Sequence, residues 1–97
     1  MSETVFESIK KNKTQMIALQ KLLTAIPALD PSSGGKGELQ KCLALESWLR
    51  ENGIENLERF DAADERADSG IRPNLVATVP GKKNQNFWIM THLDVVP

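Results

Sequence analysis

Residues 86–97 read Asn-Phe-Trp-Ile-Met-Thr-His-Leu-Asp-Val-Val-Pro, and this stretch decides the fold that we expect. Its first half, residues 86–91, is apolar at both odd and even positions. That continuity is typical of a strand covered on two faces in an α/β sheet. His92 and Asp94 follow directly, where the strand would end. A strand covered on both faces needs helices as well as other strands around it, and the rest of the chain should supply them.

Two helices are expected ahead of this strand. Apolar side chains recur at helical spacing over residues 3–25, and Pro27 ends that helix because a proline disfavours the α conformation of the residue before it. A loop rich in Pro, Ser and Gly follows over residues 27–37. The second helix should begin near residues 35–37 and end at Gly53, a residue typical of helix C-termini. The apolar stripe of the first helix consists of Ile9, Met16, Leu19, Leu23 and Ile26.

Three strands are expected after the second helix. Residues 56–62 alternate moderately between polar and apolar side chains, and residues 74–79 are rich in β-forming residues. A Pro-Gly turn separates them from the third strand at 86–91. The acidic stretch 63–71 has no period and is expected to be an exposed loop. The predicted fold class is therefore α/β, with two N-terminal helices followed by three strands.

The position of the third strand predicts an unfinished domain. It is the most apolar of the three, and no element follows it to cover a face or pair its free edge. Such an edge would aggregate if left alone. We therefore expect residues 1–97 to be the opening, incomplete portion of a larger domain.

Composition excludes several classes of protein. The chain has 12 Lys and Arg against 13 Asp and Glu, and this balance argues against nucleic-acid or anionic-membrane partners. Its one cysteine, Cys42, cannot form an internal disulfide and is expected to fill core together with Trp48. No apolar run approaches the roughly 20 residues of a membrane span, and the N-terminus is charged where a signal peptide would be apolar. A cytoplasmic protein is expected.

Two patterns resemble ligand sites without meeting their requirements. Residues 32–37, Ser-Ser-Gly-Gly-Lys-Gly, follow a helix, whereas a phosphate-binding loop follows a strand and has a different spacing. The second pattern is acidic but lacks the spacing and central Gly of an EF-hand. It comprises Asp61, Asp64, Glu65 and Asp68. Both stretches are expected to be solvated loops.

His92 and Asp94 are the remaining candidates for chemistry. They stand two positions apart at a strand end, so their side chains should leave the same face. A neutral imidazole can bind zinc, and a carboxylate can orient the ring and raise its basicity. A hydrogen-bonded structural pair is the alternative on these residues alone, because catalytic zinc takes three protein ligands and the chain offers no second or third.

A wider set of residues resembles a known family. Residues 72–81, Arg-Pro-Asn-Leu-Val-Ala-Thr-Val-Pro-Gly, and the stretch 87–97 are similar to the zinc metallopeptidase family of acetylornithine deacetylase, succinyl-diaminopimelate desuccinylase, aminoacylase and glutamate carboxypeptidase. That family typically shows an R-P-N strand, a glycine turn, an apolar strand and then H-x-D-V-V-P. Ile26-Pro27, the Ser/Gly loop and Gly37-Glu38 also resemble its N-terminal region.

This resemblance implies a hydrolase with two metal ions, usually zinc, with cobalt or manganese as alternatives. Its substrates would be N-acyl amino acids or small peptides, whose amide bond is attacked by a metal-activated water. By position, His92 resembles the first zinc ligand, and Asp94 resembles the catalytic carboxylate that orients it. Arg72 and Asn74 are given structural roles, and no substrate-binding residue is assigned. The full-length protein would be a zinc-exopeptidase-like homodimer, and residues 1–97 alone would be inactive because the other ligands and the general base lie downstream.

Two other readings stay open at this point. One is a complete, small α/β binding module in which His92 and Asp94 are only structural. The other is a metal-binding module that completes its ligand set by self-association. The exposed final strand argues against the first.

Overall fold

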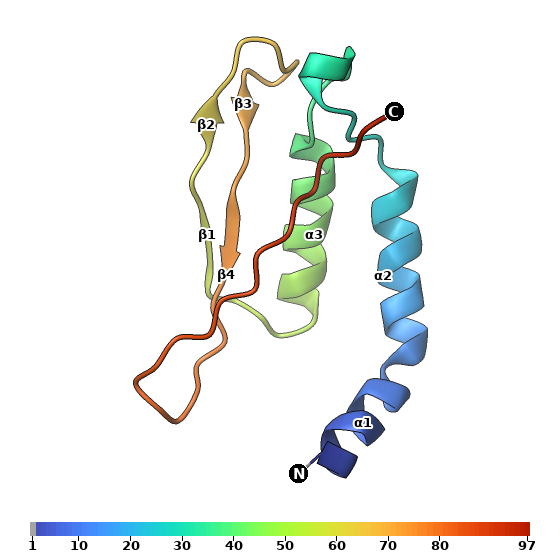
Figure 1. The fold of residues 1–97 in the computed structure, drawn as a ribbon, viewed down its shortest axis with the longest axis vertical. Coiled ribbons are helices and arrows are strands. Elements are labelled where there is room, and N and C mark those ends of the chain that lie inside the picture. The colour runs from blue at the N-terminus through green and yellow to red at the C-terminus, as the bar shows by residue number, and fades with distance from the viewer. Residues whose placement is uncertain (1) are drawn as a thin grey trace.

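The computed structural model describes residues 2–97, with side chains from residue 4 onward. Helices occupy the first half of the chain and short antiparallel strands the second (Figure 1), so the α/β prediction is confirmed. None of the helices within residues 2–97 is long and apolar enough to cross a membrane. The helices are α1 (Ser2–Lys11), α2 (Lys13–Ala25), the 3-10 helix η1 (Pro31–Ser33) and α3 (Leu39–Glu51). The strands are β1 (Leu57–Arg59), β2 (Ala62–Ala63), β3 (Ile71–Arg72) and β4 (Leu75–Ala77).

The helix predicted for residues 3–25 is divided in two at Asn12. The Asn12 side chain donates a hydrogen bond of 2.8 Å to the carbonyl of Ser8, which competes with the helical pattern at the junction. α2 packs against α3, and the half-buried residues of its predicted stripe are Leu19, Leu23 and Ile26. Ile9 and Met16 remain about half exposed, so only the last three residues of the stripe contribute to the packing.

α3 carries the most buried side chain of this fold. Cys42 is fully buried, as predicted, and burial raises the pKa of its thiol. Trp48 is half-buried on the same helix. The helix ends as predicted at Gly53, which has a φ of 85° and donates its N–H to the carbonyl of Arg50.

The four strands form one long hairpin that is interrupted at its middle. β1 pairs with β4 and β2 pairs with β3, both antiparallel. β1 and β4 lie within the predicted strands at 56–62 and 74–79, whereas β3 was not predicted, and Ala63 and Ile71 fall in the stretch 63–71 that was expected to be a loop. Pro73 lies at the interruption and lacks an N–H to donate. Beside it, Nδ2 of Asn74 donates a 2.9 Å hydrogen bond to the carbonyl of Phe60, and the Phe60 N–H donates to the carbonyl of Asn74, so the two sides of the hairpin stay bonded there.

The covered third strand that we expected at 86–91 does not form. Within residues 2–97 no segment pairs with it, and Phe87, Trp88, Ile89 and Met90 are 72–94% exposed. The radius of gyration is 15.6 Å, above the about 13 Å of a compact domain of this length. The apolar composition of residues 86–91 indicates burial on both faces, but the described residues cover neither face.

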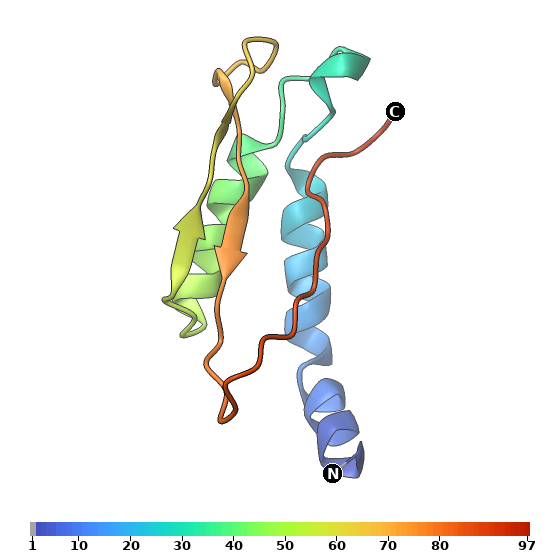
Figure 2. The ribbon, with the colours of Figure 1, turned by 60° about the vertical axis from the view of Figure 1, so that its left-hand side comes forward.

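The segment after residue 91 instead returns to the loop that follows α2 (Figures 1 and 2). Leu29 and Val95 form a parallel bridge. Its hydrogen bonds run from the Val95 N–H to the carbonyl of Ala28, at 2.9 Å, and from the Asp30 N–H to the carbonyl of Val95, at 3.2 Å. The bridge therefore attaches the segment that carries His92 to the loop between α2 and α3.

That loop can close only because residue 35 is glycine. A Cβ atom at Gly35 would lie 2.0 Å from the carbonyl oxygen of Leu29, an overlap that backbone atoms cannot relieve locally. The Gly35 N–H donates to the carbonyl of Asp30, and the Gly37 N–H donates to the carbonyl of Leu29.

Gly35→Ala should therefore destabilise the protein by at least the upper end of the about 1–3 kcal/mol typical of overpacking. Gly81→Ala is the matched control, because a Cβ there meets nothing within 4 Å. Urea unfolding measures both. Equal stability of the two variants would contradict this account of the loop.

Candidate functional site

The candidate site lies where three parts of the chain meet. His92 and Asp94 stand on the returning C-terminal segment, and Arg72 ends β3. Glu38 directly precedes α3, and Asp30 directly precedes η1. The Leu29–Val95 bridge brings these segments together.

The structure brings His92 and Asp94 into contact. Nδ1 of His92 lies 2.7 Å from the backbone carbonyl oxygen of Asp94 and 3.1 Å from its Oδ1. Both oxygens are acceptors, so we assign the proton of the neutral ring to Nδ1. The lone pair is then on Nε2, which has no hydrogen-bond partner within residues 2–97. The His92 side chain is 80% exposed, so Nε2 is open to solvent.

Arg72 is the centre of the charged cluster around this pair. Its Nε donates to both carboxylate oxygens of Glu38, at 2.8 and 3.0 Å. Its Nη2 donates to Oδ2 of Asp94 at 3.3 Å. Its Nη1 makes longer bonds to Asp30, at 3.4 Å, and to Asp64, at 3.5 Å. One guanidinium thus joins four carboxylates from four separate positions in the chain.

Burial makes the Glu38–Arg72 pair the strongest of these contacts. Glu38 is 5% exposed, and a charge that is buried to this extent requires a bonded counter-charge. The bonds to Glu38 raise the pKa of Arg72 above its usual value, so the guanidinium is always charged. Hydrogen bonds from Arg66, supplemented by Arg72, hold the pKa of Asp64 well below its usual value. Hydrogen bonds from Ser32 lower the pKa of Asp30.

The acidic run predicted to be a solvated loop is largely ion-paired. Asp61 pairs with Arg59, Asp64 with Arg66 and Arg72, and Asp68 with Lys36. Sequence reasoning also missed Glu38 and Asp30 as partners of Arg72. The only available signal was an acidic residue ahead of an amphipathic helix, and this is equally explained by the helix dipole.

The described residues can hold a metal ion through one ligand. Nε2 of His92 is a suitable donor, and Asp94 orients its ring in the way that carboxylates support zinc-bound histidines. No three His, Cys, Asp or Glu side chains within residues 2–97 are placed so that they could hold one metal ion. The carboxylates near His92 are instead bonded to Arg72. The donor set therefore fits one ligand and its support.

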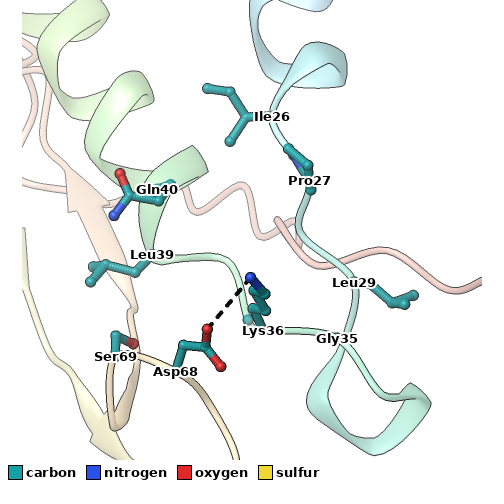
Figure 3. Close-up of a pocket in the computed structure, with 10 residues that line it drawn as sticks. Ile26, Pro27, Leu29, Gly35, Lys36, Leu39, Gln40, Asp68 and Ser69 are labelled. Atoms are coloured by element: carbon teal, nitrogen blue, oxygen red, sulfur yellow. Dashed lines mark ion pairs between the residues drawn. The ribbon is translucent and has the colours of Figure 1, made fainter.

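A separate hollow of about 600 Å³ lies between the end of α2, the start of α3 and the tip of the hairpin (Figure 3). Ile26, Leu29 and Leu39 give it an apolar lining. The Lys36–Asp68 ion pair, at 3.9 Å, stands at its wall (Figure 3). His92, Arg72 and Asp94 do not line it, so the hollow is distinct from the candidate site.

Asp64 should make stability depend on acidity. Its pKa is lower in the folded protein than in the unfolded chain, so its stabilising effect is complete above about pH 5 and is lost as the pH falls through about 4 and below. Asp64→Asn should lower stability at pH 7 and should lose less stability than the parent protein between pH 7 and pH 3. Urea midpoints at the two pH values measure this.

Glu65→Gln is the control, because Glu65 is exposed and makes no ion pair within residues 2–97. If Asp64→Asn and the parent protein lost equal stability between pH 7 and pH 3, the bonds from Arg66 and Arg72 to Asp64 would not contribute to stability.

Comparison with known proteins gives two relatives. The chain is 30% identical over 87 residues to an uncharacterized metallohydrolase of Methanococcus maripaludis. It is 34% identical over 90 residues to an uncharacterized metallohydrolase of Methanocaldococcus jannaschii. Each match covers 86% of this chain and 21% of the relative, so the chain spans about a fifth of the length of the curated relatives that it matches. No protein-family model matches the chain, and no solved structure matches it significantly.

Proposed function

We propose that this chain is the opening portion of the catalytic domain of a metal-dependent hydrolase, with His92 as a metal ligand. One observation carries the proposal: both nearby oxygens of Asp94 face Nδ1 of His92, so the exposed Nε2 is left to bind a metal. The two relatives, each named a metallohydrolase, support the class of reaction.

The finer proposal follows from the resemblance of residues 72–81 and 87–97 to the zinc metallopeptidase family. The enzyme would bind two zinc ions and cleave the amide bond of N-acyl amino acids or small peptides. The metal would supply an activated water and stabilise the negative charge that develops on the attacked carbonyl.

The chain's own residues have defined parts in this proposal. Asp94 accepts a hydrogen bond from Nδ1–H of His92, which fixes the tautomer and makes Nε2 a better electron-pair donor to a metal. Nε2 faces solvent, so ligands from elsewhere in the protein can approach the same ion. Residues 2–97 supply neither those ligands nor a general base, and so we expect no activity from them alone.

The packing favours this proposal over a complete binding module. Among the described residues only Ala28, Cys42 and Ala67 are buried apolar side chains, whereas residues 87–90 are exposed. A self-sufficient domain would close its core over such an apolar segment. In the proposal, further parts of the catalytic domain cover residues 86–91 and make them the strand that their composition indicates.

His92→Ala should abolish hydrolysis by the full-length protein and reduce its bound zinc. The reason is that the variant loses a ligand from a site where zinc needs three protein ligands. Metal content by elemental analysis and turnover of an N-acyl amino acid series measure the two effects. Full turnover with a normal zinc content would refute the proposal.

Asp94→Asn should reduce activity by about 10–100-fold, as is typical for a residue that orients a metal ligand, while much of the metal remains bound. An amide has the shape of the carboxylate but cannot accept the Nδ1 proton as strongly. Complete loss of metal would instead identify Asp94 as a direct ligand.

A further inference from the structure

We infer that Arg72 is a positioning residue for the metal ligand His92, acting through Asp94. This inference rests on the proposed function. It assigns a role to Arg72, which makes no hydrogen bond to His92 itself within residues 2–97. The juxtaposition that carries it is a single carboxylate, Asp94, whose Oδ2 accepts from Arg72 and whose Oδ1 faces His92.

Asp94 needs an external restraint to hold this orientation. The terminal torsion of an aspartate has a broad energy minimum, so the carboxylate rotates easily when it is not held. Its side chain is 32% exposed, and water would compete for both oxygens. The bond from Nη2 of Arg72 to Oδ2 removes that freedom, which leaves Oδ1 aimed at Nδ1 of His92.

Arg72 can act as a restraint because it is itself fixed. Its Nε is bonded to both oxygens of Glu38, and Glu38 directly precedes α3. A guanidinium is planar and rigid, so holding Nε and Nη1 also sets the position of Nη2. The chain of contacts therefore runs from α3 through Glu38, Arg72 and Asp94 to His92. The imidazole lies on a segment without regular secondary structure and is held by two oxygens of Asp94: the backbone carbonyl, at 2.7 Å, and Oδ1, at 3.1 Å, whose direction this chain of contacts sets.

Arg72 also keeps Asp94 in one role. A carboxylate beside a metal can turn and become a ligand itself. With Oδ2 bonded to a permanent cation, Asp94 remains a partner of the imidazole.

The test compares two variants of the full-length protein, both of which carry Glu38→Gln and only one of which also lacks the guanidinium of Arg72. Glu38→Gln removes the buried charge and leaves Arg72 able to bond Asp94. Glu38→Gln combined with Arg72→Met removes the guanidinium without leaving a buried carboxylate unpaired. Zn²⁺ affinity is measured by chelator competition on samples shown by thermal melting to be folded. Because an amide oxygen at this position still accepts from Nε of Arg72, we expect Glu38→Gln to bind Zn²⁺ at most a few-fold more weakly than the parent. The double variant should bind about tenfold more weakly than Glu38→Gln.

A cycle with Asp94→Asn separates positioning from a general structural role. If Arg72 acts through Asp94, adding Arg72→Met to Glu38→Gln/Asp94→Asn should weaken Zn²⁺ binding no further. An additional tenfold loss in that background would overturn the inference, and so would equal affinity of Glu38→Gln with and without Arg72→Met. Should the double variant not fold, Arg72→Lys takes its place. One ammonium cannot bond Glu38 and Asp94 through separate nitrogens, so a several-fold loss is expected and an unchanged affinity overturns the inference.

Arg66→Gln is the matched control. It removes a guanidinium from the same acidic cluster, where Arg66 pairs with Asp64 and has no bond to Asp94 within residues 2–97. Its Zn²⁺ affinity should equal that of the parent. Failure of the proposed function has a different signature: His92→Ala would then bind Zn²⁺ normally, whatever the Arg72 variants do.

Discussion

The contact between Arg72 and the buried Glu38 is the constraint on which the rest of this structure depends. A carboxylate that is 5% exposed at the start of a helix needs a counter-charge, and β3 brings one 34 residues further along the chain. Once the guanidinium is there, its remaining nitrogens hold the loop before η1, the hairpin and the returning segment. The start of α3, the hairpin and the candidate metal ligand therefore share one point of attachment.

The backbone makes this convergence possible with few apolar contacts. Gly35 lets the loop after α2 approach Leu29 closely, and the Leu29–Val95 bridge aligns the returning segment with that loop. In the hairpin, the Asn74 side chain bonds the carbonyl of Phe60 at the interruption, so the ribbon continues past it to place Arg72. Polar interactions therefore fix the relative positions of these segments, which an apolar core would fix in a compact domain.

Local features of this fold could be predicted from the sequence, whereas long-range features could not. Periodicity located α2, α3, β1 and β4, and Gly53 marked the end of α3, whereas the β2–β3 end of the hairpin was expected to be a loop. The His92–Asp94 contact was predictable because it spans only two residues. The partners of Arg72 lie 34 and 22 residues away, and no local pattern encodes such pairings. Residues 86–91 show the other limit: their composition indicates burial, whereas Phe87 to Met90 are exposed among the described residues.

The Leu29–Val95 bridge has a consequence for the order of events during translation. It joins residues from nearly opposite ends of the described chain, and contacts of such high contact order form late because a long loop must close first. On the ribosome, α2, α3 and the hairpin can assemble while Val95 is still inside the exit tunnel. The His92 imidazole acquires its orientation only afterwards, so a nascent chain cannot present it in its final geometry before the scaffold has folded.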